Sequence, residues 1–161
     1  MFKRLILVAG VLQFSLAFAQ TAPVVSAAEA AATLKTSIEK NTVDTLMKGT
    51  AVEGGQASVA MLYRNKAETS ALIHDHATEI YYILEGSGTL TTGGKLEDAT
   101  VTDLTRLGAG MSHSGKHVGG TDRHVAPHDI IIVPGGMPHR FSQLDEPIKY
   151  LVYRFDPSHK Q

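Results

Sequence analysis

The stretch ALIHDHATEIYYILEG, residues 71–86, holds two histidines separated by one residue, a glutamate three residues further on, and an apolar run that ends in Glu-Gly. In a β-strand, residues i and i+2 point to the same side, so a strand here directs His74 and His76 to one side. Glu79 would fall on the opposite side of an unbroken strand. We therefore expect a turn or bulge at residues 77–78, after which a new strand directs the carboxylate of Glu79 back toward the histidines.

A second stretch, DIIIVPGGMPHRF at residues 129–141, carries a further histidine. Its apolar strand meets a Pro-Gly-Gly turn, and the turn delivers His139 to the start of the next strand. Imidazole and carboxylate donors without a thiolate suit a divalent transition metal, with Fe, Mn, Zn, Ni and Cu all open. A metal-free barrel with hydrogen-bonded histidines is the alternative that these residues leave open.

The two stretches resemble the two motifs of the cupin superfamily, Gly-x5-His-x-His-x3-4-Glu-x6-Gly and Gly-x5-Pro-x-Gly-x2-His-x3-Asn. The matching residues are His74, His76, Glu79 and Gly86 in the first motif, and Pro134, Gly136 and His139 in the second. The departures are Glu68 and His128 in place of the leading glycines, Gln143 in place of the asparagine, and a gap of two residues between His76 and Glu79. The short gap bears on whether Glu79 can reach a metal.

The resemblance implies an all-β fold, the cupin-type double-stranded β-helix or jelly-roll barrel, and a metal site formed by His74, His76, Glu79 and His139. If Glu79 cannot turn inward, a three-histidine site is the alternative. Tyr81 shares the side of Glu79 in the new strand, where its hydroxyl is a candidate catalytic proton donor or, equally, an aromatic filler of the core.

Short β-type segments with Gly and Pro punctuation fill the chain from residue 57 to residue 155, which agrees with an antiparallel barrel. The segments expected as strands are 57–64, 71–76, 79–84, 88–92, 129–133, 140–144 and 148–155. Before them, Ser26 and Glu29 have the spacing of a capping box, and the Ala-rich residues up to Met47, with a break near Asn41, favour a short N-terminal helix.

The chain begins with Lys3 and Arg4, an apolar run, and an Ala-Phe-Ala tripeptide, which is the pattern of a secretory signal peptide. We expect residues 1–19 to be the signal peptide, residues 20–50 a lead-in and helix, and residues 51–161 the cupin domain. The protein would then be secreted or periplasmic, with no membrane contact after cleavage.

Composition narrows the classes of partner. Removal of Lys3 and Arg4 changes the formal charge from −1 to −3, and no basic cluster follows, so nucleic acid is not an expected partner. The chain has no cysteine, so neither a disulfide nor a thiolate ligand is available. Cupins commonly pair through strand edges, which makes a homodimer possible.

About 40 residues separate the motifs, and the Gly-rich end of this segment carries four further histidines, namely His113, His117, His124 and His128. We expect a long hairpin or loop over the barrel mouth. A second metal site is one interpretation of these histidines, and exposed loop histidines with no joint role is the favoured one.

The fold alone does not fix an activity. The favoured hypothesis is an exported, mononuclear metal-dependent enzyme acting on a small oxygenated organic molecule, with dioxygenase chemistry ahead of isomerase or lyase chemistry. The alternative is an exported module that binds a small ligand, a sugar or an organic acid, without turnover.

Overall fold

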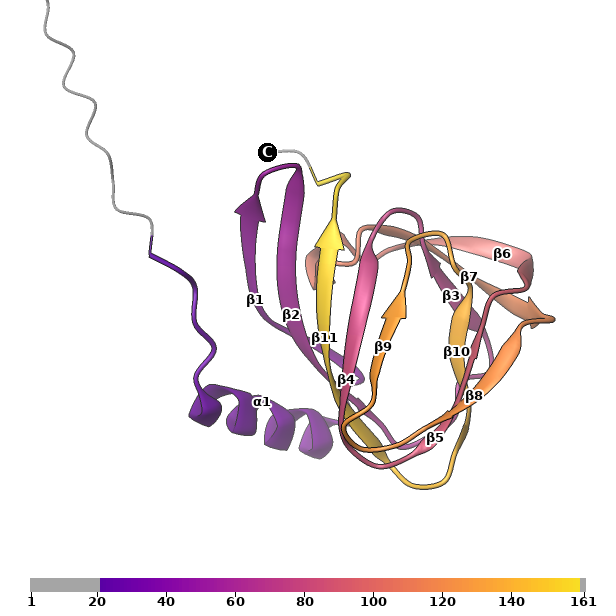
Figure 1. The fold of residues 1–161 in the computed structure, drawn as a ribbon, viewed down its shortest axis with the longest axis horizontal. Coiled ribbons are helices and arrows are strands. Elements are labelled where there is room, and N and C mark those ends of the chain that lie inside the picture. The colour runs from indigo at the N-terminus through magenta and orange to yellow at the C-terminus, as the bar shows by residue number, and fades with distance from the viewer. Residues whose placement is uncertain (1–20, 160–161) are drawn as a thin grey trace, which may run out of the picture.

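The computed structural model describes residues 21–159 and consists of one α-helix followed by two antiparallel sheets that face each other (Figure 1). The elements are α1 (Ala27–Lys40), β1 (Asp44–Val52), β2 (Gly55–Arg64), β3 (Ala71–His74), β4 (Thr78–Glu85), β5 (Gly88–Thr92), β6 (Lys95–Asp103), the 3-10 turn η1 (Thr105–Leu107), β7 (Met111–Val118), β8 (Thr121–Val125), β9 (Ile130–Val133), β10 (His139–Leu144) and β11 (Ile148–Asp156). The strand orders are β1-β2-β11-β4-β9 and β6-β7-β3-β10-β5-β8. The predicted all-β jelly-roll barrel with a short N-terminal helix is confirmed.

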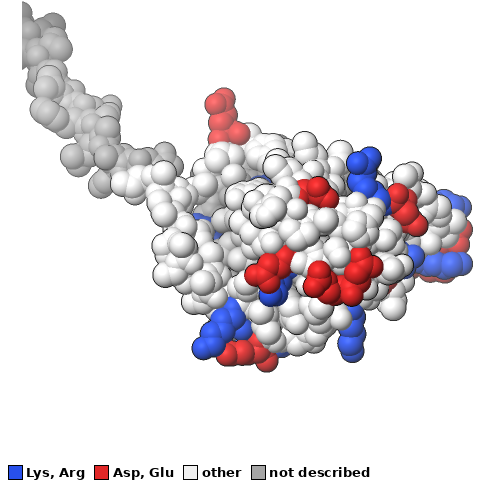
Figure 2. All heavy atoms as spheres, turned by 60° about the horizontal axis from the view of Figure 1, so that its bottom comes forward, with Lys and Arg blue, Asp and Glu red and all other residues white. Residues whose placement is uncertain are grey.

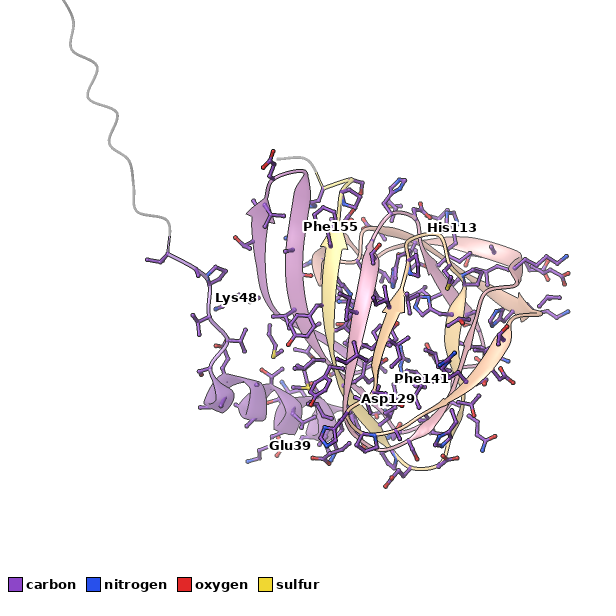
Figure 3. The ribbon with its side chains drawn as sticks, in the orientation of Figure 1. Glu39, Lys48, His113, Asp129, Phe141 and Phe155 are labelled. Carbon is purple, nitrogen blue, oxygen red and sulfur yellow. The ribbon has the colours of Figure 1, made fainter. Side chains whose placement is uncertain are left out.

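The core lies between the two sheets, because strands on both sides alternate inward and outward residues. In β11 the inward positions are Ile148, Tyr150, Val152, Arg154 and Asp156, all buried. The fully apolar part of the core is formed by Ala60, Leu62, Tyr81, Ile83, Leu90, Val125, Val133, Phe141, Ile148, Tyr150 and Val152. Phe141 is among the side chains drawn between the sheets in Figure 3.

Helix α1 begins as the capping box predicts, because the Ser26 hydroxyl accepts a hydrogen bond of 3.1 Å from the backbone N–H of Glu29. It ends at Lys40, where Asn41 takes up the left-handed conformation of a helix C-terminus with φ 50°. The prediction that the helix continues to Met47 is therefore wrong. The residues after the cap form β1 instead, and a hydrogen bond of 3.0 Å between Ser37 and Thr45 joins the helix to that strand.

The expected long hairpin between the motifs is formed by β6 and β7. It extends the six-stranded sheet through pairing of β7 with β3, and β8 then pairs with β5 at the far edge of the same sheet. The sequence predicted a hairpin or loop over the barrel mouth, whereas β7 and β8 lie in the six-stranded sheet itself. These strands contain few large apolar residues; β8, for example, reads Thr-Asp-Arg-His-Val. The hydrophobic periodicity that indicates a strand is therefore weak here.

Gly86 illustrates how one motif residue supports the barrel. Its φ is 81°, and a Cβ at this position would overlap the carbonyl oxygen of Pro147. Gly54 has the same φ of 81°, but a Cβ there would meet no atom within 4 Å. Comparing the two positions therefore distinguishes the cost of a left-handed backbone from the cost of steric overlap.

We therefore expect Gly86→Ala to lower the free energy of unfolding by about 2–3 kcal/mol, and Gly54→Ala by about 1 kcal/mol, because only the first substitution adds overlap to the left-handed strain. Urea denaturation of both variants measures the difference. Equal losses would show that the chain adjusts around residue 86.

On the face shown in Figure 2, side chains of both charges are interspersed, and Lys and Arg do not gather in one place. Among residues 21–159, no helix is long and apolar enough to cross a membrane.

Candidate metal centre

Three strands bring together three side chains of the kind that bind metals. His74 is the last residue of β3, Glu79 the second residue of β4, and His139 the first residue of β10. One donor atom from each lies within 4.8 Å of the other two. The exposed fractions of the residues are 4%, 1% and 6%, so the cluster lies inside the barrel.

Close backbone approaches fix the ends of these strands. The N–H of Gly136 donates a hydrogen bond of 2.7 Å to the carbonyl of His74, which ties the turn before β10 to the end of β3. A Cβ on Gly135 would overlap the backbone of His76, so only glycine lets the two segments come this close. The Pro-Gly-Gly turn thus places His139 beside His74.

The carboxylate of Glu79 is held from behind by two donors. Arg154 Nε lies 2.8 Å from Oε1, and the hydroxyl of Tyr81 donates to Oε2 at 2.7 Å. An ionised carboxylate has about four lone-pair sites. With one site on each oxygen occupied, one on each remains for the histidines, whose Nε2 atoms lie 3.4 Å from Oε1 and Oε2 respectively.

The other nitrogen of each imidazole is also engaged. His74 Nδ1 lies 2.8 Å from the Ser112 hydroxyl, and His139 Nδ1 lies 3.0 Å from the Met137 carbonyl oxygen, to which it donates. Metal-binding histidines usually have such a partner, which fixes the ring and leaves Nε2 free to bind.

The spacing of the donors fits a metal ion. Separations of 3.4 Å between Nε2 and carboxylate oxygen are longer than ordinary charged hydrogen bonds. They match the edge of a tetrahedron with bonds of about 2.1 Å, which is about 3.4 Å. His74, Glu79 and His139 could therefore hold one divalent metal ion with little movement.

Electrostatics favour a cation beside Glu79. Burial alone would raise the pKa of Glu79, but the neighbouring imidazoles of His139 and His74 and the charge of Arg154 hold that pKa well below its usual range. Burial and the neighbouring Glu79 charge raise the pKa of Tyr81 well above its usual range. Glu79 is thus ionised and Tyr81 protonated near neutral pH.

Strands from both sheets contribute to one internal cluster, and the strand order is that of the double-stranded β-helix that the two motifs predict. The chain has a cupin fold.

Comparison with known proteins adds structures that resemble this cupin fold. No family model matches the chain, and no curated protein matches its sequence. Similar solved structures include a Bacillus halodurans protein with 18% identity and a TM-score of 0.42, which covers 65% of this chain and 66% of its own. A Klebsiella pneumoniae protein with a double-stranded β-helix domain has 12% identity and a TM-score of 0.47, covering 74% of this chain and 83% of its own.

A third similar structure is the DMSP lyase of Ruegeria pomeroyi, with 20% identity and a TM-score of 0.42. The match covers 65% of this chain and 41% of the lyase, so the chain spans less than half of that protein. With TM-scores below 0.5, these similarities say nothing about the substrate or activity of this chain.

His76 does not join the cluster. Strand β3 ends at His74, and His76 lies exposed in the bend that leads to β4. The prediction that the two histidines share a strand face is wrong, because the bend begins one residue after His74. After the same bend, the inward and outward alternation starts again in β4, so the side chain of Glu79 points inward as expected.

Sequence reasoning missed Arg154 and Asp44, which complete the surroundings of Glu79. Arg154 Nη2 lies 2.6 Å from Asp44 Oδ2, and its Nη1 donates a hydrogen bond of 2.8 Å to the Leu107 carbonyl. The alternation in residues 148–155 could have indicated Arg154, since it shares the inward side of Tyr150 and Val152.

The four histidines between the motifs have separate partners. His113 pairs with Asp75, His117 with the Gly93 carbonyl, His124 with Asp145, and His128 with the Tyr82 hydroxyl. Within residues 21–159, none of these four histidines belongs to a group of three ligand-type side chains whose donor atoms lie within 4.8 Å of one another. The expectation of exposed loop histidines holds for His128, whereas His113 and His117 lie half-buried in β7 and His124 lies exposed in β8.

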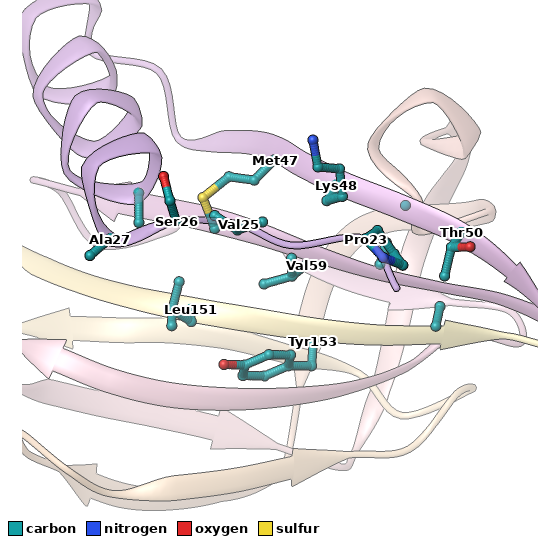
Figure 4. Close-up of a pocket in the computed structure, with 14 residues that line it drawn as sticks. Pro23, Val25, Ser26, Ala27, Met47, Lys48, Thr50, Val59, Leu151 and Tyr153 are labelled. Carbon is teal, nitrogen blue, oxygen red and sulfur yellow. The ribbon is translucent and has the colours of Figure 1, made fainter. Parts of the chain in front are cut away.

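A pocket of about 420 Å³ lies away from the cluster, between the segment before α1 and the outer face of β2 and β11 (Figure 4). Its lining is mostly apolar and includes Pro23, Val25, Met47, Val59, Leu151 and Tyr153.

Proposed function

We propose that the protein is an exported, mononuclear metal-dependent cupin enzyme that acts on a small oxygenated organic molecule, by dioxygenase chemistry or by isomerase or lyase chemistry. The observation that supports this most is the convergence of His74, Glu79 and His139, with donor atoms within 4.8 Å of one another. The metal is a divalent transition ion whose identity the donors leave open among Fe, Mn, Zn, Ni and Cu.

Such an ion, when bound, supplies open coordination positions and Lewis acidity for an oxygenated ligand. The chain supplies the rest. Glu79 offsets part of the positive charge, while Ser112 and the Met137 carbonyl orient the two imidazoles. The surrounding aromatic core excludes water, which strengthens each electrostatic interaction inside.

We propose that the Tyr81 hydroxyl keeps its proton and directs it to Oε2 of Glu79. Its hydroxyl donates to that oxygen at 2.7 Å, and its ring lies against the rings of Phe141 and Tyr150. A role as proton donor to substrate would require this hydrogen bond to be exchanged. The hydroxyl of Tyr81 thus stabilises the carboxylate, while its ring packs in the core.

Burial limits the size of the substrate. Since His74, Glu79 and His139 have exposed fractions of 6% or less, a ligand that reaches them is small or enters when neighbouring side chains move. Dioxygen and short organic acids meet this requirement better than sugars.

The second candidate is the exported binding module without turnover. The observation that favours it is the pocket between the segment before α1 and the outer sheet face, whose volume of about 420 Å³ suits a small molecule. The apolar lining favours an apolar ligand over a sugar.

Export is part of the proposal, and the signal peptide expected at residues 1–19 lies outside the described residues. The expected domain boundary between residues 50 and 51 falls within β1, so we propose that the functional unit includes β1. A homodimer remains a prediction.

Metal titration with oxygen uptake tests the proposed enzyme. We expect one equivalent of Fe²⁺, Mn²⁺, Zn²⁺, Ni²⁺ or Cu²⁺ to raise the melting temperature, because only the folded state presents the cluster. The loaded protein is then assayed for oxygen uptake and for product with small phenols, keto acids and sugars. Ligand-induced shifts in melting temperature without turnover of any compound would favour the binding module.

A further inference from the structure

Arg154 bridges two carboxylates inside the barrel. Its Nε lies 2.8 Å from Glu79 Oε1, and its Nη2 lies 2.6 Å from Asp44 Oδ2. The side chains of Arg154, Glu79 and Asp44 have exposed fractions of 2%, 2% and 19%. These three charges therefore interact through a medium that screens them much less than water does.

The second carboxylate comes from the strand that precedes the motif-bearing part of the chain. Asp44 is the first residue of β1, and it pairs across the sheet with Leu62 of β2. Arg154 also donates to the carbonyl of Leu107 in η1. Asp44 and Leu107, which are far apart in the sequence, thus bind one side of the guanidinium, and Glu79 accepts a hydrogen bond from its other side.

The order of charges matters for a cation at Glu79. Arg154 alone would cancel the negative charge of Glu79 and would repel a divalent ion bound to it. Asp44 offsets that positive charge, so the row of Asp44, Arg154 and Glu79 carries one net negative charge. Because the Nη atoms of Arg154 donate to Asp44 and Leu107, only Nε donates to Glu79, whose remaining lone pairs stay available for a metal.

We propose that Asp44, acting through Arg154, strengthens the binding of a divalent metal by Glu79 and its two histidines, which makes the first residue of β1 a positioning residue of the metal centre. This inference rests on the proposed function. It assigns a role to β1, which the motifs do not cover.

Asp44→Asn tests the inference, because it removes the charge without changing size and touches no metal-binding side chain. Arg154 then keeps its contacts to Glu79 and Leu107, and the amide oxygen can still accept from it. We expect the dissociation constant for Co²⁺ to rise at least about tenfold, the order of effect of one unit charge near a buried divalent ion.

The measurement uses the full chain and Co²⁺ alone, followed by its visible absorption and by competition with a chelator at 25 °C. The absorption bands of bound Co²⁺ should keep their positions, because the donor atoms are unchanged. Asp44→Glu, which keeps the charge, should bind within about threefold of wild type, and Asp44→Ser should weaken binding as Asp44→Asn does.

Glu53→Gln is the matched control, since it removes the same charge from the exposed turn after β1 and should change affinity less than twofold. Equal affinity of wild type, Asp44→Asn and Asp44→Ser, whatever their melting temperatures, would overturn the inference and leave the metal centre standing. Failure of the wild-type protein to bind Co²⁺ would overturn the proposed metal centre itself.

Discussion

Replacing His139 with alanine is expected to reduce the metal content from about one ion per chain to less than about a tenth. His139 provides one of three donor atoms within 4.8 Å of one another, and its ring is already fixed by the Met137 carbonyl. Loss of one ligand from a three-residue site leaves too few donors to retain the ion against dialysis. Elemental analysis after loading and dialysis measures this loss.

His76→Ala is the matched control, because His76 is exposed in the bend beside the cluster and provides no donor to it. We expect its metal content to equal that of the wild type. A full equivalent of metal in His139→Ala would contradict the site. Loss in both variants would instead mean that the bend turns inward to supply a fourth ligand.

The difference between His139 and His76 also shows which parts of the site can be predicted from the sequence. The motif spacing singled out His74, Glu79 and His139, because His74 ends a strand and the other two lie at the start of one, where turn residues or a change of period mark the boundary. The exclusion of His76 depends on where the bend begins. That point is set by Gly135 packing against the backbone of His76, a contact between segments almost 60 residues apart.

The errors in the N-terminal region have a related cause. The residues up to Met47 were expected to favour helix, with Leu46 and Met47 as apolar positions after a break near Asn41. The left-handed cap at Asn41 and the pairing of β1 with β2 prevail over that local preference. With β1 assigned to a helix, the pairing of Asp44 with Arg154 could not be predicted.

Replacing Arg154 with methionine is expected to lower the free energy of unfolding by about 3–5 kcal/mol. Methionine keeps much of the side-chain volume but leaves Glu79 and Asp44 without their shared cation, and Glu79 has an exposed fraction of 1%. Breaking a buried ion pair from one side is costly because the remaining charge is neither solvated nor paired. Urea denaturation of the metal-free protein measures the loss.

Lys149→Met provides the comparison on the same strand. Lys149 pairs with Glu85, whose side chain has an exposed fraction of 62%, so water can solvate the carboxylate once the lysine is gone. We expect a loss of less than about 1 kcal/mol for this exposed pair. Equal losses in the two variants would mean that the burial of Glu79 adds nothing to the cost.

A second substitution separates charge from packing at the buried pair. Adding Glu79→Gln to Arg154→Met replaces the unpaired carboxylate with a neutral amide that still accepts from Tyr81. If uncompensated charge causes the loss, the double variant should recover part of the stability and be more stable than Arg154→Met alone. If lost packing of the guanidinium against β1 and η1 causes it, the second substitution should recover nothing, and the contacts of Arg154 with Asp44 and Leu107 would account for the loss.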